Sequence, residues 1–292
     1  MSQPTYAAQQ TAARGPGILV VTGGTDGIGR ALAERRLGLG DTVVIIGRAR
    51  EKGEAFLAHA REIGAADRAR LLRADLGLVA ENRRVLDELR GAFPVIDTLV
   101  FCARHYRSDR AETAEGVEET FAHFYLSRYL LGHGLADALG RSAHPVVVNV
   151  AGPGAGLDVI RWDDLEFRDG YHGGAALGQA GKLNDLLGVV SAERYADAGL
   201  RYVLVHPGAT VTSLSGQYDE ATRRHIEEMQ RTAKPLAQAL EPIAAVVDRP
   251  PRQPLSAFVE GRELDVRTGD FDAAAARRLD EVTEVVLKKV PA

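Results

Sequence analysis

The chain has 292 residues, a formal net charge of −4 and a single cysteine, Cys102. This charge provides no basic surface for nucleic acid, and no apolar run approaches the roughly 20 residues of a membrane span. One cysteine cannot form an internal disulfide and suits a reducing cytoplasm. No spacing of His, Cys and Asp indicates a metal site. We therefore expect a cytoplasmic globular protein that acts on a small molecule without a metal.

Short apolar segments alternate with helical patterns along most of the chain. Residues 1–16 are rich in Gln, Ala, Thr and Gly and are expected to form a disordered leader. The expected strands cover 17–22, 42–47, 70–73, 96–101, 145–150 and 201–206. The expected helices cover 27–39, 50–63, 79–92, 115–139 and 178–198. Strands that are almost entirely apolar are typical of a parallel sheet covered on both faces. The pattern predicts an α/β fold of the Rossmann type, a doubly wound parallel sheet in a single domain over 17–292.

The segment after the last expected strand has a different pattern. Residues 217–248 have the pattern of two amphipathic helices, followed by a proline-rich break at 250–254 and a closing helix at 272–288. The apolar positions of the first segment are Ile226, Met229, Leu236, Leu240 and Ile243. We expect a small C-terminal helical lid over a partly apolar substrate, although plain core packing would give the same pattern.

The most informative stretch follows the first expected strand. Its sequence is Thr22-Gly23-Gly24-Thr25-Asp26-Gly27-Ile28-Gly29. Spaced glycines between an apolar strand and a helix let the backbone turn tightly and approach a pyrophosphate, which the free N–H groups at the helix start then bind. A plain strand–helix turn is the alternative, but a second apolar strand follows at the distance expected of a βαβ unit. The stretch therefore predicts a dinucleotide site.

From residue 16 to about residue 290 the chain resembles the short-chain dehydrogenase/reductase family. The glycine stretch matches the TGxxxGIG loop of that family, and Asp75 matches the acid beside the adenine. His206-Pro207-Gly208-Ala209-Thr210-Val211-Thr212 resembles the PG…T segment beside the nicotinamide. Arg161-Trp162-Asp163-Asp164-Leu165 and Ala275-Ala276-Arg277-Arg278-Leu279 resemble the subgroup of retinol dehydrogenases and protochlorophyllide reductases. The cofactor contacts that the resemblance implies are Gly23, Thr25, Asp26, Gly27, Ile28, Gly29, Asp75, Leu76, Cys102, Ala103, Pro207, Gly208, Thr210 and Thr212.

Arg48 stands at the end of the second expected strand, where the cofactor is selected. An acid there binds the ribose 2′-hydroxyl of NAD, whereas an arginine accommodates the 2′-phosphate of NADP. Arg50 and Lys52 add two cations at a helix start, where cations are unfavourable unless an anion is bound. A solvated basic helix start is the alternative. We predict NADP(H) as the cofactor, with Arg48 as a contact.

The resemblance also implies a catalytic serine, tyrosine, lysine and asparagine, and most of them are missing. Gly152 takes the place of the serine, and Phe124 takes the place of the asparagine. Two registers are possible for the tyrosine and the lysine, namely Leu177 with Gly181 or Gly178 with Lys182. Either register lacks the phenol. The dinucleotide loop is thus complete, while the proton chemistry of the family is changed or lost.

Four residues are candidates for substitute chemistry. Arg104, where the family has glycine, is expected to bind a carboxylate or stabilise an oxyanion; contact with a cofactor phosphate or with solvent is an equal alternative. His105 is a candidate general base and Tyr171 a candidate acid, although plain loop roles suit both. Lys182 is a candidate contact to the nicotinamide ribose. Cys102, in contrast, is expected to be a small buried residue and no nucleophile.

These observations predict a divergent NADP(H)-dependent oxidoreductase that lacks the usual Ser, Tyr and Asn. Two alternatives remain, because a fold does not determine a function. One is a non-redox cyclase, isomerase or lyase that retains NADP(H), and the other is a catalytically silent NADP(H)-binding protein. Since the family commonly forms dimers or tetramers through its two long helices, the resemblance implies a homodimer or homotetramer.

Overall fold

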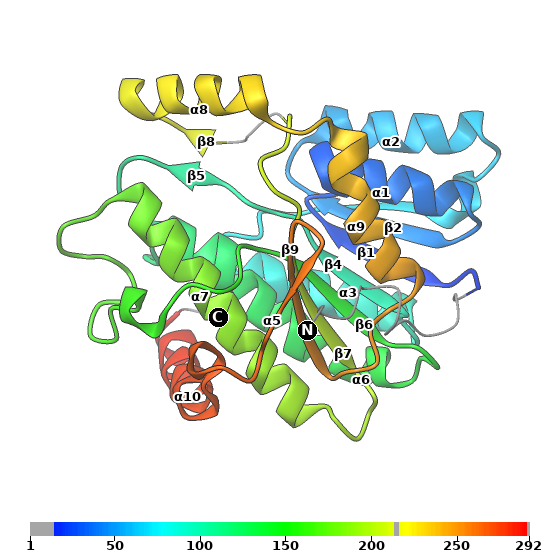
Figure 1. The fold of residues 1–292 in the computed structure, drawn as a ribbon. Coiled ribbons are helices and arrows are strands. Elements are labelled where there is room, and N and C mark those ends of the chain that lie inside the picture. The colour runs from blue at the N-terminus through cyan, green and yellow to red at the C-terminus, as the bar shows by residue number, and fades with distance from the viewer. Residues whose placement is uncertain (1–14, 213–215, 291–292) are drawn as a thin grey trace.

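A computed structural model describes residues 15–212 and 216–290. Most of the expected leader, residues 1–14, therefore lies outside the described residues. An eight-stranded sheet forms the centre of the molecule, in the order β10-β9-β7-β6-β4-β1-β2-β3 (Figure 1). The strands are β1 (Ile18–Thr22), β2 (Thr42–Gly47), β3 (Ala69–Arg73), β4 (Thr98–Phe101), β6 (Val146–Val150), β7 (Arg201–His206), β9 (Leu255–Val259) and β10 (Arg262–Leu264). All pairs are parallel except β9 with β10. The order from β3 to β7 is that of the doubly wound dinucleotide fold, so the predicted fold class is confirmed.

Two strands of the sheet were not expected from the sequence. Strand β9 pairs in parallel with β7 from Tyr202↔Leu255 to His206↔Val259. The chain then turns through Glu260 and Gly261, both with positive φ, into β10. A short apolar run between a proline-rich break and a glycine is a hairpin signal. Residues 255–259 carried that signal, because they follow Pro254 and precede Gly261.

Helices cover both faces of the sheet. They are α1 (Gly27–Gly38), α2 (Arg50–Glu62), α3 (Val79–Ala92), α4 (Glu119–Phe121), α5 (Ser127–Gly134), α6 (Ala136–Gly140), α7 (Gly173–Arg194), α8 (Glu220–Thr232), α9 (Leu236–Asp248) and α10 (Ala273–Lys289). The apolar faces of α1, α2 and α9 belong to one core cluster, and those of α3, α5, α7 and α10 belong to the other. The described chain therefore has a helix layer on each side of the sheet.

The expected helix over 115–139 is wrong as a single helix. Glu118 accepts hydrogen bonds from the backbone N–H groups of Thr120 and Phe121, and the first turn starts only after this cap. A π-helical turn over Ala122–Leu126 follows before α5, and a break at Leu135 separates α5 from α6. Such π turns are frequent at functional sites. This one carries Phe124, at the position of the family's asparagine.

The segment 217–248 does not form one lid. Leu240 and Ile243 of α9 are 8% and 0% exposed, and they belong to the core cluster beneath α1. Helix α9 is therefore a covering layer of the sheet. Helix α8, in contrast, has no buried residue and lies beside β8 (Gly216–Gln217), above β5 (Tyr106–Arg107), away from the main sheet (Figure 1). The part that can still act as a lid thus consists of residues 106–108 and 216–232, which we call the flap.

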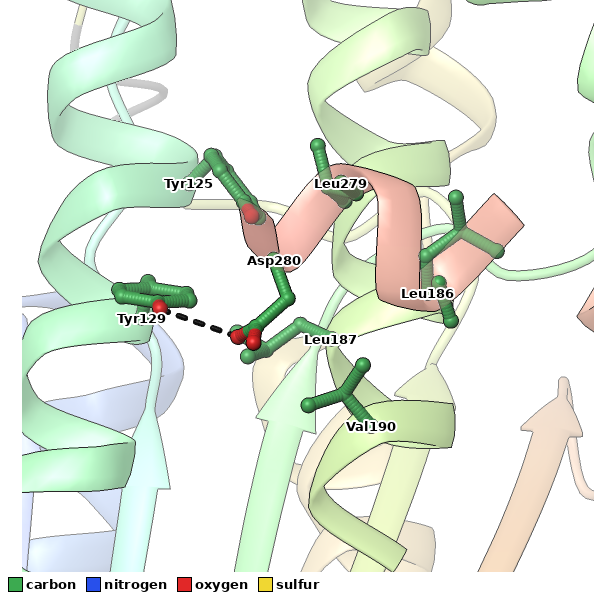
Figure 2. Close-up of a pocket in the computed structure, with 8 residues that line it drawn as sticks. Tyr125, Tyr129, Leu186, Leu187, Val190, Leu279 and Asp280 are labelled. Atoms are coloured by element: carbon green, nitrogen blue, oxygen red, sulfur yellow. Dashed lines mark hydrogen bonds between the residues drawn. The ribbon is translucent and has the colours of Figure 1, made fainter. Parts of the chain in front are cut away.

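Helix α10 covers the two long helices that were expected to contact a second subunit. The hydroxyl of Tyr125 lies 2.7 Å from Thr283 Oγ1, and Tyr129 donates to Asp280 at 3.0 Å. Figure 2 shows the narrow crevice between these helices, which has no room for a water molecule. The guanidinium of Arg278 also stacks 4.3 Å from the Trp162 ring, so the two segments that resemble the retinol dehydrogenase subgroup meet. The chain's own helix α10 therefore occupies this face of α5 and α7.

The same junction generates a prediction about pH dependence. His133 on α5 has a side chain that is 13% exposed, and burial followed by the charge of Arg194 lowers its pKa to about 4. Unfolded histidine titrates near pH 6.5. Because the folded pKa is the lower one, the unfolded chain binds more protons between these values. The free energy of unfolding should therefore fall as the pH drops from about 6.5 to about 4, by up to about 1.4 kcal/mol per pH unit from this residue.

The variant His133→Gln should show a smaller loss of stability over this interval than the wild type in urea unfolding at several pH values. The exposed loop residue His144 provides the control, and His144→Gln should keep the wild-type dependence. Identical pH dependence in His133→Gln and the wild type would contradict the assignment.

Candidate active site

The glycine loop between β1 and α1 is packed so closely that side chains are excluded. A Cβ on Gly23 would lie 2.7 Å from the backbone N of Ala103, and Gly23 also has φ +67°. A Cβ on Gly29 would lie 2.5 Å from the carbonyl oxygen of Gly23. Asp26 caps α1 by accepting a hydrogen bond from the Gly27 N–H at 2.7 Å. The loop is thus held against the carboxyl end of β4, as close approach of backbone to a pyrophosphate requires.

The PG…T segment meets this loop in space. A Cβ on Gly27 would lie 3.2 Å from Cγ2 of Thr212. Within the segment, Thr210 Oγ1 donates to the carbonyl oxygen of Gly208 at 3.0 Å, and the N–H of Gly208 donates to His206 Nδ1 at 2.8 Å. Residues about 180 positions apart in the chain therefore form one cradle, with no side chain at Gly27 to fill it.

The other expected cofactor residues surround the cradle. The side chains of Leu76 and Ala103 are buried in one core cluster, and the partly buried side chain of Ile28 packs against the other. Thr25 lies over the end of β2, where a Cβ on Gly47 would come within 2.7 Å of its Cγ2. The carbonyl oxygen of Pro207 accepts a hydrogen bond from Lys234 Nζ at 3.4 Å.

Burial raises the pKa of the Cys102 thiol to about 12, which keeps it protonated and unreactive.

The three cations near the start of α2 differ in their partners. Arg50 is paired with Glu54 at 2.6 Å, and Lys52 is paired with Asp26 of the glycine loop. Arg48 faces Asp75 at a looser 3.6 Å, and both side chains are nearly half exposed. The charges of Arg50 and Lys52 are therefore already compensated, and Arg48 is the cation best able to take an additional anion.

Gly152 and Gly181, at which the resemblance implies the catalytic serine and, in one register, the lysine, lie close together, and we call these two residues the floor of the site. A Cβ on Gly181 would lie 3.7 Å from the carbonyl oxygen of Gly152, and a Cβ on Gly152 would lie 3.4 Å from Cδ2 of His206. Lys182 is fully buried instead, with its ammonium 3.2 Å from Asp185 and 5.0 Å from the centre of the Phe271 ring. This placement favours the ungapped register, with Leu177 and Gly181 at the tyrosine and lysine positions. Lys182 forms a structural ion pair, and we do not retain it as a candidate.

Arg104 and His105 have different surroundings. Arg104 is exposed, yet desolvation lowers its pKa, as expected for a side chain within a recess of the surface. Burial raises the pKa of Tyr218, and the charge of Arg104 opposes this rise only in part. Burial and then the charge of Arg104 lower the pKa of His206. Burial, then Arg48 and Arg107, lowers the pKa of His105. Arg104 therefore lies within electrostatic reach of His206, and His105 lies within that of Arg48 and Arg107.

Tyr171 is used to anchor its loop. Its hydroxyl donates to Glu118 Oε1 at 3.2 Å and lies 3.2 Å from Thr120 Oγ1. Burial raises the pKa of Tyr171 to about 12. These contacts join the loop before α7 to the cap of α4, and we do not retain Tyr171 as a catalytic candidate.

Sequence reasoning missed a buried arginine beneath the site. Arg128 is 1% exposed and donates to the carbonyl oxygens of Ala103 at 3.0 Å and Val150 at 3.1 Å, and also to Asn149 Oδ1. Its guanidinium stacks 4.1 Å from the centre of the Phe124 ring. Phe124 thus supports a cation beneath the carboxyl ends of β4 and β6. An arginine within an apolar helical stretch was the available signal.

The comparisons with known proteins agree with this geometry. Residues 17–161 match the family model described as short chain dehydrogenase. The chain belongs to the short-chain dehydrogenase/reductase family, a family of oxidoreductases. It is 29% identical to human polyprenol dehydrogenase over 213 residues, which cover 70% of this chain and 64% of that protein. It is 28% identical to an NADP-dependent (R)-specific alcohol dehydrogenase of Lentilactobacillus kefiri, over 77% of this chain and 84% of that protein.

Solved structures support the fold. A short-chain dehydrogenase from Sphingobium yanoikuyae in complex with NADPH superposes with a TM-score of 0.63 at 21% identity, over 94% of this chain and 96% of that one. Within the described residues, no helix is long and apolar enough to cross a membrane. No group of three or more His, Cys, Asp or Glu side chains in residues 15–212 and 216–290 is arranged to hold a metal ion.

The packing of the glycine loop generates a second prediction. Gly29→Ala should destabilise the fold by about 1–3 kcal/mol, because the new methyl group meets backbone that cannot rotate away, and it should weaken dinucleotide binding. Gly38→Ala is the matched control at the end of the same helix, where a Cβ meets nothing within 4 Å. Thermal unfolding and a fluorescence titration with NADPH measure both effects. Equal behaviour of the two variants would contradict the role given to Gly29.

Proposed function

We propose that this protein is an NADP(H)-dependent oxidoreductase with a non-standard active site. The proposal rests on two features that lie close together. The cradle has all of the glycines of the family's loop, whereas the floor lacks the side chains that the family uses. Gly23, Gly27 and Gly29 keep the backbone open for a pyrophosphate, while Gly152 and Gly181 stand where the family places side chains for proton transfer.

NADP(H) fits the residues at the cradle. The N-terminus of α1 and the backbone of residues 23–29 would hold the pyrophosphate, and Asp75 would lie beside the adenine, as in the family. Arg48 would pair with the 2′-phosphate, because its contact with Asp75 is loose and half exposed. The NADP named with the Lentilactobacillus relative and the NADPH bound to the Sphingobium structure agree with this preference.

The chemistry of the floor follows from its side chains. When bound, NADP(H) supplies or accepts the hydride. Arg104 would bind the oxygen of the substrate and stabilise the negative charge that develops there. A guanidinium does not release its proton at neutral pH, so Arg104 orients and stabilises rather than acting as an acid. The half-exposed stripe of α8 that includes Ile226 and Met229 would cover a partly apolar substrate.

Two further expectations belong to this proposal. The single cysteine and its protonated thiol suit the cytoplasm. A homodimer or homotetramer would have to use a surface other than the faces of α5 and α7 that α10 covers. A non-redox enzyme would turn over its substrate without any change in nicotinamide absorbance, and a silent binding protein would show no turnover.

Arg48 provides a test of the cofactor. Arg48→Ala should weaken NADPH binding by about tenfold or more, because it removes a charge-assisted pair of about 1.5–3 kcal/mol, and should leave NADH binding nearly unchanged. Calorimetric titration with both nucleotides measures the two constants. Arg50→Ala is the matched control, since its charge is already paired with Glu54. Equal weakening of NADPH and NADH in Arg48→Ala would overturn the assignment.

Arg104 provides a test of the floor. With the carbonyl compound that the wild type reduces fastest, Arg104→Ala should lower kcat/KM by about 100-fold or more, the effect of removing one oxyanion donor. The NADPH dissociation constant should change little. Arg168→Ala, which removes an exposed arginine paired with Glu166, should leave both unchanged. A loss of NADPH affinity in proportion to activity would place Arg104 on the cofactor instead.

A further inference from the structure

Arg128 on α5 is a buried cation whose hydrogen-bond partners are uncharged. The residue is 1% exposed, and its three acceptors are the carbonyl oxygens of Ala103 and Val150 and the Oδ1 atom of Asn149. No Asp or Glu in the part of the chain that the structure describes forms an ion pair with Arg128, and its buried Nε has no acceptor there. The positive charge of this side chain therefore has no counter-charge beside it.

The surroundings keep this guanidinium charged and in place. Burial lowers the pKa of Arg128 to about 10, which still leaves the side chain protonated at neutral pH. Its guanidinium carbon lies 4.1 Å from the centre of the Phe124 ring and 5.9 Å from the centre of the Phe101 ring. Aromatic rings attract a cation but carry no net charge themselves. They therefore hold the guanidinium without cancelling its field.

Asn149 is oriented so that its oxygen faces Arg128. Its Nδ2 donates to Asn184 Oδ1 at 2.9 Å and to the hydroxyl of Tyr202 at 2.7 Å. The side-chain amide of Asn184 in turn donates to two backbone carbonyl oxygens. Since these hydrogen bonds determine the orientation of both amides, the Oδ1 atom of Asn149 is left to accept from Arg128. The buried network thus consists of neutral groups around one cation.

The order of the strands places Arg128 on the nicotinamide side of the cradle. Strands β4 and β6 lie on one side of β1, and β2 lies on the other. Arg48, after β2, would take the phosphate of the adenosine half, so the nicotinamide half would extend over the ends of β4 and β6. Ala103 and Val150, which accept from Arg128, are at these ends. A Cβ on Gly23 would lie 2.7 Å from the backbone N of Ala103, so the arginine's acceptor borders the glycine loop directly.

Neighbouring charged side chains leave the positive charge in excess. Lys182 and Asp185 form an ion pair at 3.2 Å, so their charges offset each other. Arg104 lies within electrostatic reach of Arg128 and adds a second positive charge. Burial and the charge of Arg104 lower the pKa of His206, so this ring is neutral near pH 7.

We propose that Arg128 makes this protein bind NADPH in preference to NADP⁺, and that the proposed oxidoreductase therefore acts as a reductase. The nicotinamide ring carries a positive charge in NADP⁺ and no charge in NADPH. A buried cation beneath the ring disfavours the oxidised nucleotide, whereas it has little effect on the reduced one. The inference rests on the proposed function, because it assigns a direction to that reaction.

This preference suits the reduction of a carbonyl compound. The carbonyl carbon of the substrate accepts the hydride, the electron pair of its π bond moves to the oxygen, and water supplies the proton that completes the alcohol. The carbonyl compound is reduced, and NADPH is oxidised to NADP⁺. Arg128 leaves the equilibrium constant in solution unchanged, but it favours release of NADP⁺ and keeps the site occupied by NADPH when both nucleotides are present.

The ratio of two dissociation constants tests the proposal. A unit charge about 10 Å from the ring, at an effective dielectric constant of about 20, changes binding by about tenfold. In calorimetric titration the wild type should bind NADPH about tenfold more tightly than NADP⁺ or better, and Arg128→Met should lower this ratio by about tenfold. Arg128→Lys keeps the charge and should keep most of the preference.

A second variant separates charge from structure. Loss of the hydrogen bonds of Arg128 would weaken both nucleotides equally, and the ratio would not change. Asn149→Asp keeps Arg128 and places a carboxylate against it, so this variant should also lower the ratio. Arg36→Met is the matched control, because it removes a buried arginine that is paired with Asp41 at the opposite edge of the sheet. The control should keep the wild-type ratio.

The outcomes distinguish this inference from the proposed function. Equal affinity of the wild type for NADPH and NADP⁺, or an unchanged ratio in the folded variants Arg128→Met and Asn149→Asp, would overturn the inference. The proposed function would still stand if the wild type oxidises NADPH with a carbonyl compound. If the ratio changes as expected but the wild type reduces none of a panel of aromatic and aliphatic ketones and aldehydes, the effect of Arg128 on binding holds, whereas the proposed function and its direction fail.

Discussion

The candidate site depends on one buried cation. The guanidinium of Arg128 donates to the carbonyl oxygens of Ala103, after β4, and Val150, at the end of β6. Arg104 directly follows the first of these residues, and Gly152 comes two positions after the second. A buried charge is tolerated only when hydrogen bonds replace its hydration, so the acceptors and the cation hold each other in place. The single side chain of Arg128 therefore fixes the ends of β4 and β6 relative to each other. Burial lowers the pKa of Arg128 to about 10.

Glycine determines what the site can contain. In the cradle, Gly23 and Gly29 permit contacts between backbone segments that any Cβ would prevent. On the floor, Gly152 and Gly181 contribute no side chain, and the His206 ring lies beside the backbone of Gly152. In the flap, Gly216 makes room for the ring of Tyr218. Glycine thus permits close backbone packing in the cradle, and it leaves the floor without side chains.

Helix α8 differs from α9 and α10 in the number of buried contacts that attach it to the rest of the protein. Helices α9 and α10 bury apolar faces in the two cores, and α10 adds the hydrogen bonds of Asp280 and Thr283. Helix α8 buries no residue and is attached through hydrogen bonds at Ser108 and Gln217. Segments with few buried contacts open most easily. The flap is thus the part of the site best suited to admit a substrate, while the sheet and its covering helices keep their positions.

Local patterns in the sequence were enough to predict the sheet and the glycine loop of the cradle. Apolar runs of strand length and the loop Gly23–Gly29 take their structure from local sequence, and the predicted strands of the main sheet from β1 to β7 are confirmed. Arg48 could be proposed as a cofactor contact in the same way, because that prediction follows from its position after β2. The strand β9 was missed although its signal was present, since five residues after a proline-rich break give a weak pattern.

Only the tertiary structure decided which side chains occupy the floor. Sequence reasoning selected Lys182 and Tyr171, yet the first is paired with Asp185 and the second with Glu118. It did not consider the ring of His206, which lies beside Gly152 although the two residues are 54 positions apart along the chain. Periodicity and spacing report which face of an element is buried, and they do not report which distant elements meet. The sequence by itself predicted the doubly wound sheet and the glycine loop, because both follow from local patterns, and only the folded chain decided which distant side chains lie beside that loop.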